Sequence, residues 1–155
     1  MNDCPESEDQ TESNESRPPD QRLTAALDEM GVISEIDPSG DIIVYVECTE
    51  NRSQQVIVDS STREFMGVEM RTIASIALNS QGPFEGRTAN FLLRENARLE
   101  FGAWNVIFDT EKTHYAVFSV TVSAALRAQS LCDLIGMVAR IADDTENRLS
   151  GLDEF

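Results

Sequence analysis

The chain has 155 residues, a length that fits one domain and allows a hydrophobic core without disulfides or metals to support it. Apolar residues make up 41% and charged residues 26%, which excludes the collagen-like, disulfide-scaffold and fully disordered classes. The 28 Asp and Glu residues against 12 Lys and Arg give a net charge of −16. Such a surface repels phosphate groups, so we expect no sequence-independent binding to nucleic acid or to an anionic membrane.

Several acidic residues gather at the N-terminal end. Residues 1–19 are rich in Glu, Ser, Asn and Gln and hold too few apolar side chains to offset the entropy of ordering, so we expect a disordered acidic tail. The chain lacks both a signal-like basic start with an apolar run and a stretch of about 18 apolar residues, so we expect a cytoplasmic protein without a membrane partner. The cysteines Cys4, Cys48 and Cys132 are widely spaced and are interpreted as reduced thiols.

A single folded domain is predicted over residues 20–149, followed by a frayed acidic end over 150–155. It begins with an amphipathic helix that Asp20 caps and Gly31 ends. Strands are then predicted over 32–36 and 41–48, joined by a Pro/Gly turn, and over 54–59, before a turn at 60–64.

Residues 65–78 fit two patterns. Met66, Val68 and Met70 alternate as in a strand, whereas Met70, Ile73 and Ala77 also fall on one stripe of a helix. Several β-branched residues favour a strand and Gly67 disfavours a helix, so we predict a strand.

The second half is predicted to form a helix over 88–98, two strands over 99–108 and 114–122 around a polar turn, and a long helix over 129–149. Gly136, in the middle of the last helix, is interpreted as a close approach to another backbone. The resulting order, α-β-β-β-(β)-α-β-β-α, predicts an α+β fold: an antiparallel sheet with helices packed on one face.

The stretch Phe91-Leu92-Leu93-Arg94-Glu95-Asn96, followed by Phe101-Gly102-Ala103-Trp104, resembles the YbjN family, which has the type III secretion chaperone-like fold. As an order of elements, the resemblance covers residues 20–149. It implies a small bacterial acidic domain, often dimeric, that binds other protein segments. Secretion chaperones of this fold hold an extended stretch of a client protein, and YbjN-like proteins are named as regulators. Neither group supplies catalytic residues to transfer to this chain.

Both faces of the predicted strands carry apolar residues. Ile42, Val44 and Phe118 share one parity, and the opposite parity holds a second apolar set, Ile43, Tyr45, Ile57, Tyr115 and Val117. On one interpretation this second set is an exposed patch that contacts a protein partner. On the other, a further helix or a twist of the domain covers it.

Candidate catalytic groups are few. His114 is the only histidine, and across the predicted hairpin it could approach Asp109 as a general base. Cys132 lies near the start of the last helix, where a thiolate is favoured, but its apolar neighbours indicate an inert thiol. We expect no catalytic residue, no metal and no cofactor.

The sequence therefore predicts a non-enzymatic protein-binding module, chaperone-like or regulatory, that holds a protein partner or a second copy of itself. A small-ligand sensor domain, with a cavity between the sheet and the last helix, is an alternative. An enzyme that uses His114 or a cysteine is a second alternative.

Overall fold

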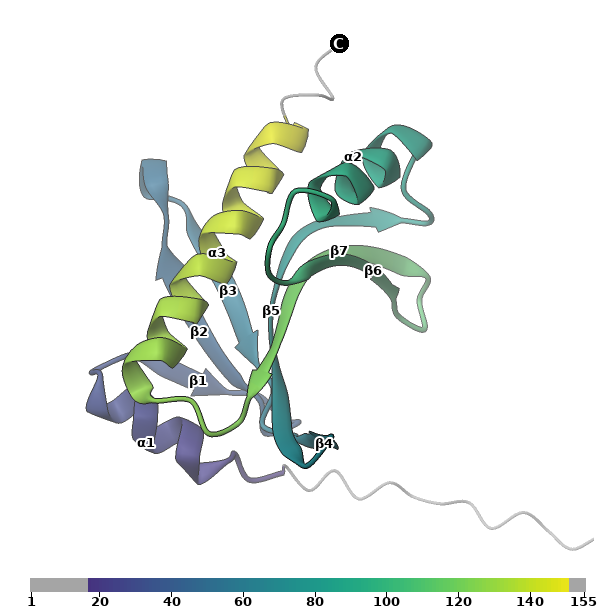
Figure 1. The fold of residues 1–155 in the computed structure, drawn as a ribbon. Coiled ribbons are helices and arrows are strands. Elements are labelled where there is room, and N and C mark those ends of the chain that lie inside the picture. Colours follow the sequence, from purple (N-terminus) through teal and green to yellow (C-terminus); the bar gives the residue numbers. More distant parts are fainter. Residues whose placement is uncertain (1–16, 151–155) are drawn as a thin grey trace, which may run out of the picture.

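The computed structural model describes residues 17–150, and these form an α+β fold (Figure 1). Its helices are α1 (Gln21–Glu29), α2 (Gly86–Asn96) and α3 (Ala128–Ser150). Its strands are β1 (Ser34–Ile36), β2 (Ile42–Glu47), β3 (Ser53–Val58), β4 (Arg63–Phe65), β5 (Val68–Gln81), β6 (Ala103–Phe108) and β7 (Thr113–Ser123). A single 3-10 turn, Thr49–Asn51, joins β2 to β3 within the described residues.

The seven strands form one antiparallel sheet in the order β1-β2-β3-β5-β7-β6, and β4 pairs with the start of β5. The long strands β5 and β7 pair with each other at the centre of the sheet. Their pairing runs from Met70 opposite Ser123 to Gln81 opposite Thr113, with a bulge between Ile76 and Leu78. The sheet therefore ends in two edges of different length, the three-residue β1 and the six-residue β6.

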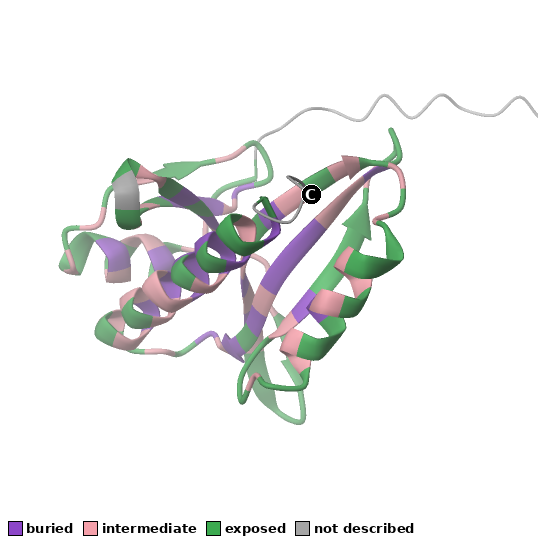
Figure 2. Cartoon of the chain, turned by 90° about the horizontal axis from the view of Figure 1, so that it is seen from above, coloured by how far each residue is buried: buried purple, intermediate pink, exposed green. Residues whose placement is uncertain are grey.

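All three helices pack on one face of this sheet (Figure 1). Helix α3 crosses β2, β3, β5 and β7, α1 packs against α3, and α2 lies over β6. Alternate strand residues point toward the helices, and Ile42, Val58, Ile73 and Phe118 among them are fully buried. Figure 2 shows buried residues running along the central strands. We call this covered side the inner face of the sheet and the opposite side the outer face.

The strand predicted over residues 65–78 is confirmed as β5, with bounds shifted toward the C-terminus. The predicted order lacks one strand, β4. All three of its residues are exposed, so apolar and polar positions do not alternate along it. A tight turn at Met66 and Gly67, whose φ angles are 51° and 78°, connects β4 to β5. The interpretation of Gly136 is wrong, because a Cβ atom there would first meet Nη1 of Arg140, on the same helix, at 3.4 Å.

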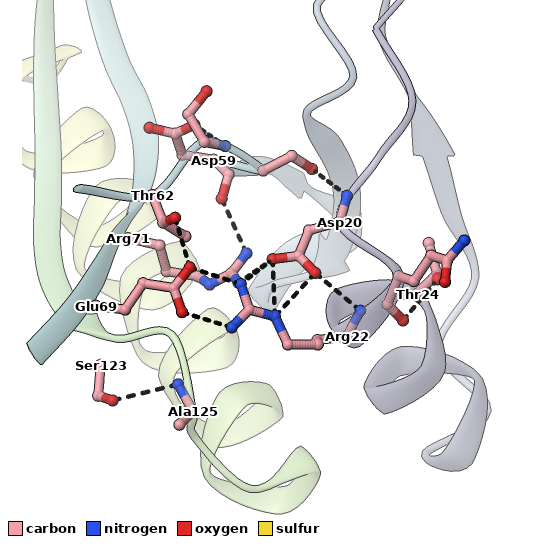
Figure 3. Close-up of polar contacts among 12 residues, drawn as sticks. Asp20, Arg22, Thr24, Asp59, Thr62, Glu69, Arg71, Ser123 and Ala125 are labelled. Carbon is pink, nitrogen blue, oxygen red and sulfur yellow. Dashed lines mark hydrogen bonds and ion pairs between the residues drawn. The ribbon is translucent and has the colours of Figure 1, made fainter. Parts of the chain in front are cut away.

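A network of charged side chains fixes the start of α1 to the sheet (Figure 3). Oδ1 of Asp20 accepts the backbone N–H of Arg22 at 2.9 Å, which confirms Asp20 as the cap of α1. Oδ2 of Asp20 accepts Nη2 of Arg71, a β5 residue that is only 2% exposed, at 2.6 Å. Nη1 of Arg71 donates to the carbonyl of Asp59 at 3.1 Å, whereas its buried Nε has no partner. Arg22 extends the network to Glu69 at 2.6 Å.

These contacts lower the pKa values of the carboxyl groups of Asp20 and Glu69. The hydrogen bond from Arg22 is the largest cause that holds the pKa of Asp20 well below its ordinary value, and Arg71 adds to it against the effect of burial. Hydrogen bonds from Arg22 and then Thr62 lower the pKa of Glu69 to about 2. Both groups are therefore ionised in the folded state under all but strongly acidic conditions.

Residues 17–19, assigned to the tail by the sequence analysis, lie against the domain. The backbone N–H of Arg17 donates to the carbonyl of Pro38 at 3.4 Å, and its guanidinium donates to Ser61 at 2.6 Å. Gly40 permits this approach, because a Cβ atom there would come within 2.5 Å of the carbonyl oxygen of Arg17. The predictions for residues 1–16 and 151–155 lie outside the described residues.

Candidate functional site

The outer face of the sheet carries all five residues of the predicted contact set. Ile43 on β2 lies opposite Ile57 on β3, and Tyr45 is two residues further along β2. Tyr115 and Val117 lie on β7. None of the five belongs to the core that the helices cover. Tyr45 is 54% exposed, whereas Val117, at the centre of the sheet, is 7% exposed.

Two further strands add apolar residues to this face: β5 lies between β3 and β7, and β6 lies beyond β7 at the edge of the sheet. On β5, Ala74 is opposite Ile57 and Ile76 is opposite Val117. On β6, Ile107 is opposite Tyr115. Ile76 and Ile107 also belong to this face, although they were not among the residues predicted from the sequence to form it. The alternation of side-chain direction along the strand predicted over 99–108 could have indicated Ile107. Its position opposite Tyr115, however, depends on how β6 pairs with β7 in the folded chain.

Charged side chains are absent from much of the outer face in the part of the chain that the structure describes. The outward positions of β5 from Met70 to Ile76, of β7 from Tyr115 to Ser123, and of β6 carry only apolar or neutral polar residues. Glu35 and Glu47 lie at one side of the face, on β1 and β2. Arg63 on β4 lies at its end beside Met70 and donates to the hydroxyl of Thr121 at 3.4 Å. In a chain with a net charge of −16, this depletion marks the outer face as different from the rest of the surface.

The hairpin between β6 and β7 holds a fixed carboxylate at the end of this face. Oδ2 of Asp109 accepts the hydroxyl of Tyr115 at 3.0 Å, and Oδ1 accepts the backbone N–H groups of Glu111 and Thr113. Burial alone would raise the pKa of Asp109, but these hydrogen bonds lower it overall. The same contact raises the pKa of Tyr115. The hydroxyl of Tyr115 is therefore held at the hairpin by Asp109.

His114 and Asp109 do not form the pair considered in the sequence analysis. The carboxylate of Asp109 is occupied as described above, and the nearest polar contact of His114 joins its Nδ1 to the carbonyl oxygen of Lys112 at 2.9 Å. The imidazole ring stacks on Phe108 with the ring centroids 5.6 Å apart. These contacts explain the position of His114 through packing within the hairpin.

The two cysteines among the described residues, Cys48 and Cys132, are free and half-buried. Burial is the largest cause that raises the pKa of each thiol, and nearby carboxylates, Asp143 for Cys48 and Asp133 for Cys132, act in the same direction. The thiol forms are thus favoured at neutral pH, which agrees with the interpretation of inert cysteines.

A cleft of about 470 Å³ lies between the end of β5, the start of α2 and the end of α3. Leu78, Phe84 and Leu149 supply apolar walls, and Arg87 and Thr88 supply polar groups. It is open to solvent and mixed in polarity, unlike an enclosed apolar pocket. This cleft is the feature that corresponds to the ligand-sensor alternative.

A comparison with protein-family models finds none that matches the chain, and a comparison with curated proteins finds no similar sequence. Among the described residues, no helix combines the length and apolar character that crossing a membrane requires.

Proposed function

We propose that this protein is a non-enzymatic binding module, chaperone-like or regulatory, which holds a protein partner on the outer face of its sheet. One observation carries the proposal: a broad strand face that no described helix covers and that has almost no charge, in a strongly acidic chain. Solvent-exposed faces of antiparallel sheets normally carry polar and charged residues. Apolar side chains without charges at the centre of a face are typical of the core of a protein interface.

The chemistry of the face limits the partner. Ile43, Ile57, Ile76 and Val117 offer apolar contact, and Tyr45 and Tyr115 offer large rings with a polar end. A charged group placed at the centre would lose its hydration without gaining a counter-charge. We therefore expect the face to bind an uncharged, apolar segment of a partner.

The resemblance to the YbjN family and to secretion chaperones supports the same function, since those chaperones hold extended client segments. Self-association on this face is a second possible use of it, and the experiment below separates the two.

The test measures whether the full chain suppresses the aggregation of a thermally unfolding model protein, followed by light scattering. We expect suppression near stoichiometric amounts, and at least a tenfold weaker effect for the double variant Tyr45→Lys/Ile57→Lys. The matched control is Ile33→Lys, because Ile33 is 90% exposed and precedes β1 outside the face. A chain without any effect on aggregation, or equal loss in the control, would contradict the proposal. Suppression lost together with a dimer would indicate self-association through the face.

The open cleft beside α2 favours one other function, a small-ligand sensor. A ligand there would contact Phe84, Arg87 and Leu149. Thermal-shift screening with small anionic and apolar compounds tests it, because a bound ligand raises the melting temperature. Any stabilisation should disappear in Arg87→Ala and persist in Tyr45→Lys/Ile57→Lys.

A further inference from the structure

The edge strand β6 lacks the features that protect sheet edges from pairing. It is six residues long, Ala-Trp-Asn-Val-Ile-Phe, and contains no charge, proline or irregularity of its pairing with β7. Its second half is exposed, as Figure 2 shows for the strand beside α2. The other edge strand, β1, has only three residues. Short strands, lysine, proline or bulges usually prevent one sheet edge from pairing with another, and β6 has none of them.

One side chain covers the beginning of the β6 edge. The backbone N–H of Trp104 donates to Oδ1 of Asn96 at 2.6 Å, and Nδ2 of Asn96 donates to the carbonyl of Trp104 at 3.1 Å. These bonds show that the backbone groups of Trp104 point away from β7. Because direction alternates along a strand, the N–H and C=O groups of Val106 and Phe108 point the same way. Asn96 protects Trp104, and among residues 17–150 no group bonds to the outward backbone of Val106 and Phe108.

The geometry points to a second copy of the chain as the occupant of this open edge. We infer that two β6 strands pair antiparallel about a two-fold axis at Ile107, which joins the two sheets into one. In this register Val106 of each copy exchanges two hydrogen bonds with Phe108 of the other, and Ile107 faces its own equivalent. The register ends where Asn96 begins to cover the backbone, so every open group of the edge has a partner.

The side chains of the edge suit this register. Val106 and Phe108 are exposed on the inner-face side of β6, where they would form an apolar cross-strand pair between copies. Exposed Leu93 lies one helical turn before Asn96, and α2 and β6 run in opposite directions (Figure 1). Leu93 and Val106 therefore lie on the same side of the Asn96–Trp104 contact, and Leu93 adds apolar surface beside the edge.

The charges at the two ends of β6 are complementary. The region near its start has a net charge of +1. It holds three positive residues, Arg94, Arg98 and Arg148, and two negative residues, Glu95 and Glu100. The hairpin at its end carries Asp109 and Glu111 against Lys112, a net of −1. Antiparallel pairing brings the positive end of one copy to the negative end of the other. In a chain of net −16, this local arrangement favours a second copy in this orientation.

The inference does not rest on the proposed function, because it uses the backbone edge of β6, and Ile107 is the one residue of the outer face at that contact. The two can fail separately. If both hold, the dimer carries two outer faces side by side on one continuous sheet.

The first test combines mass measurement and disulfide trapping of the full chain, with Cys4, Cys48 and Cys132 replaced by serine. Light scattering coupled to gel filtration is run in about 0.15 M salt, where the Debye length of ~8 Å screens much of the repulsion between acidic copies. We expect a dimer. Ile107→Cys should then form an intermolecular disulfide rapidly under mild oxidation, because facing residues of a pair without hydrogen bonds lie close enough for that bond. Tyr45→Cys is the matched control, because the exposures of Tyr45 and Ile107 are 54% and 52%.

The second test changes the edge backbone. Val106→Pro removes an N–H group that does not bond to β7, so it should abolish the dimer and leave the circular dichroism spectrum unchanged. Val106→Ala keeps the N–H group and should remain dimeric. A monomer in the first test, trapping through Tyr45→Cys in place of Ile107→Cys, or a folded Val106→Pro dimer as stable as the original would overturn the inference. If Val106→Pro does not fold, the trapping experiment decides.

Discussion

The substitution Asp20→Asn tests whether the buried ion pair with Arg71 holds α1 on the sheet. Asparagine keeps the oxygen that caps α1 but removes the charge that faces Arg71. The guanidinium of Arg71 would then be buried with the carbonyl of Asp59 as its remaining partner. Removing one member of a buried pair costs about 3–5 kcal/mol, so we expect a loss of that size in the free energy of unfolding and a drop of roughly 10–20 °C in melting temperature.

Urea unfolding monitored by circular dichroism measures this loss. Glu69→Gln is the control within the same network, because the side chain of Glu69 is half exposed and solvent screens its pair with Arg22, so we expect a much smaller loss than for Asp20→Asn. Adding Arg71→Met to Asp20→Asn removes the unpaired charge and should recover part of the stability. Equal losses for Asp20→Asn and Glu69→Gln would refute the reasoning, since burial of Arg71 is what separates them.

Three further predictions follow from the structure. First, because the pKa values of Asp20 and Glu69 are lower in the folded state, their contribution to stability is complete above about pH 5 and declines as the pH falls toward 2. The difference between the original chain and Asp20→Asn in urea should therefore shrink below about pH 4, and a constant difference would contradict this assignment. Second, Gly102→Ala should cost roughly 2–4 kcal/mol, because φ is +76° and the new Cβ atom would lie 2.7 Å from Phe118 and Val120. The control Gly31→Ala, with positive φ but no atom within 4 Å, should cost only about 1 kcal/mol in the same thermal melts, and similar losses would show that crowding is not the cause. Third, Asn96→Ala leaves the backbone groups of Trp104 without their partner and should cost about 1–3 kcal/mol, and an unchanged melting temperature would show that water replaces the amide.

The sequence predicted those parts of the fold whose residues repeat with a clear period. A long helix was predicted over 129–149, and its apolar residues Leu131, Ile135, Val138 and Ala142 are buried in α3. Alternation indicated β2 and β7, and β-branched residues correctly decided the ambiguous strand β5. β4 has no such pattern, because all three of its residues are exposed, and its turn places Met66, an uncommon residue for positive φ, before Gly67.

Contacts between residues that lie far apart in the chain could not be predicted from the sequence. Asp20 was recognisable as a helix cap, but its ion pair with Arg71, 51 positions away in sequence, depends on the packing of α1 against the sheet. Likewise Asp143, on the last helix, is buried and binds Arg52 through two hydrogen bonds, at 2.9 and 3.0 Å. For the candidate site, parity placed Ile43, Tyr45, Ile57, Tyr115 and Val117 together. The strand order that puts β5 between β3 and β7, and so joins them through Ile76, needed the structure.

The distribution of charge predicts how binding to the outer face should change with salt concentration. The acidic groups lie at the chain ends, on the helices and at the rim of the sheet, so they repel acidic partners and attract basic ones over a distance of about 10 Å or less. The outer face itself has no charge at its centre, so contact there gains free energy mainly from burial of apolar surface, which added sodium chloride does not screen. Binding of an uncharged apolar partner should therefore be constant or slightly tighter between low and high salt, whereas capture of a basic partner by the acidic rim should weaken steeply. Titration of the full chain against one neutral and one lysine-flanked peptide of the same apolar sequence separates these cases. If only the lysine-flanked peptide binds, and only at low salt, then the rim and not the outer face is the binding surface.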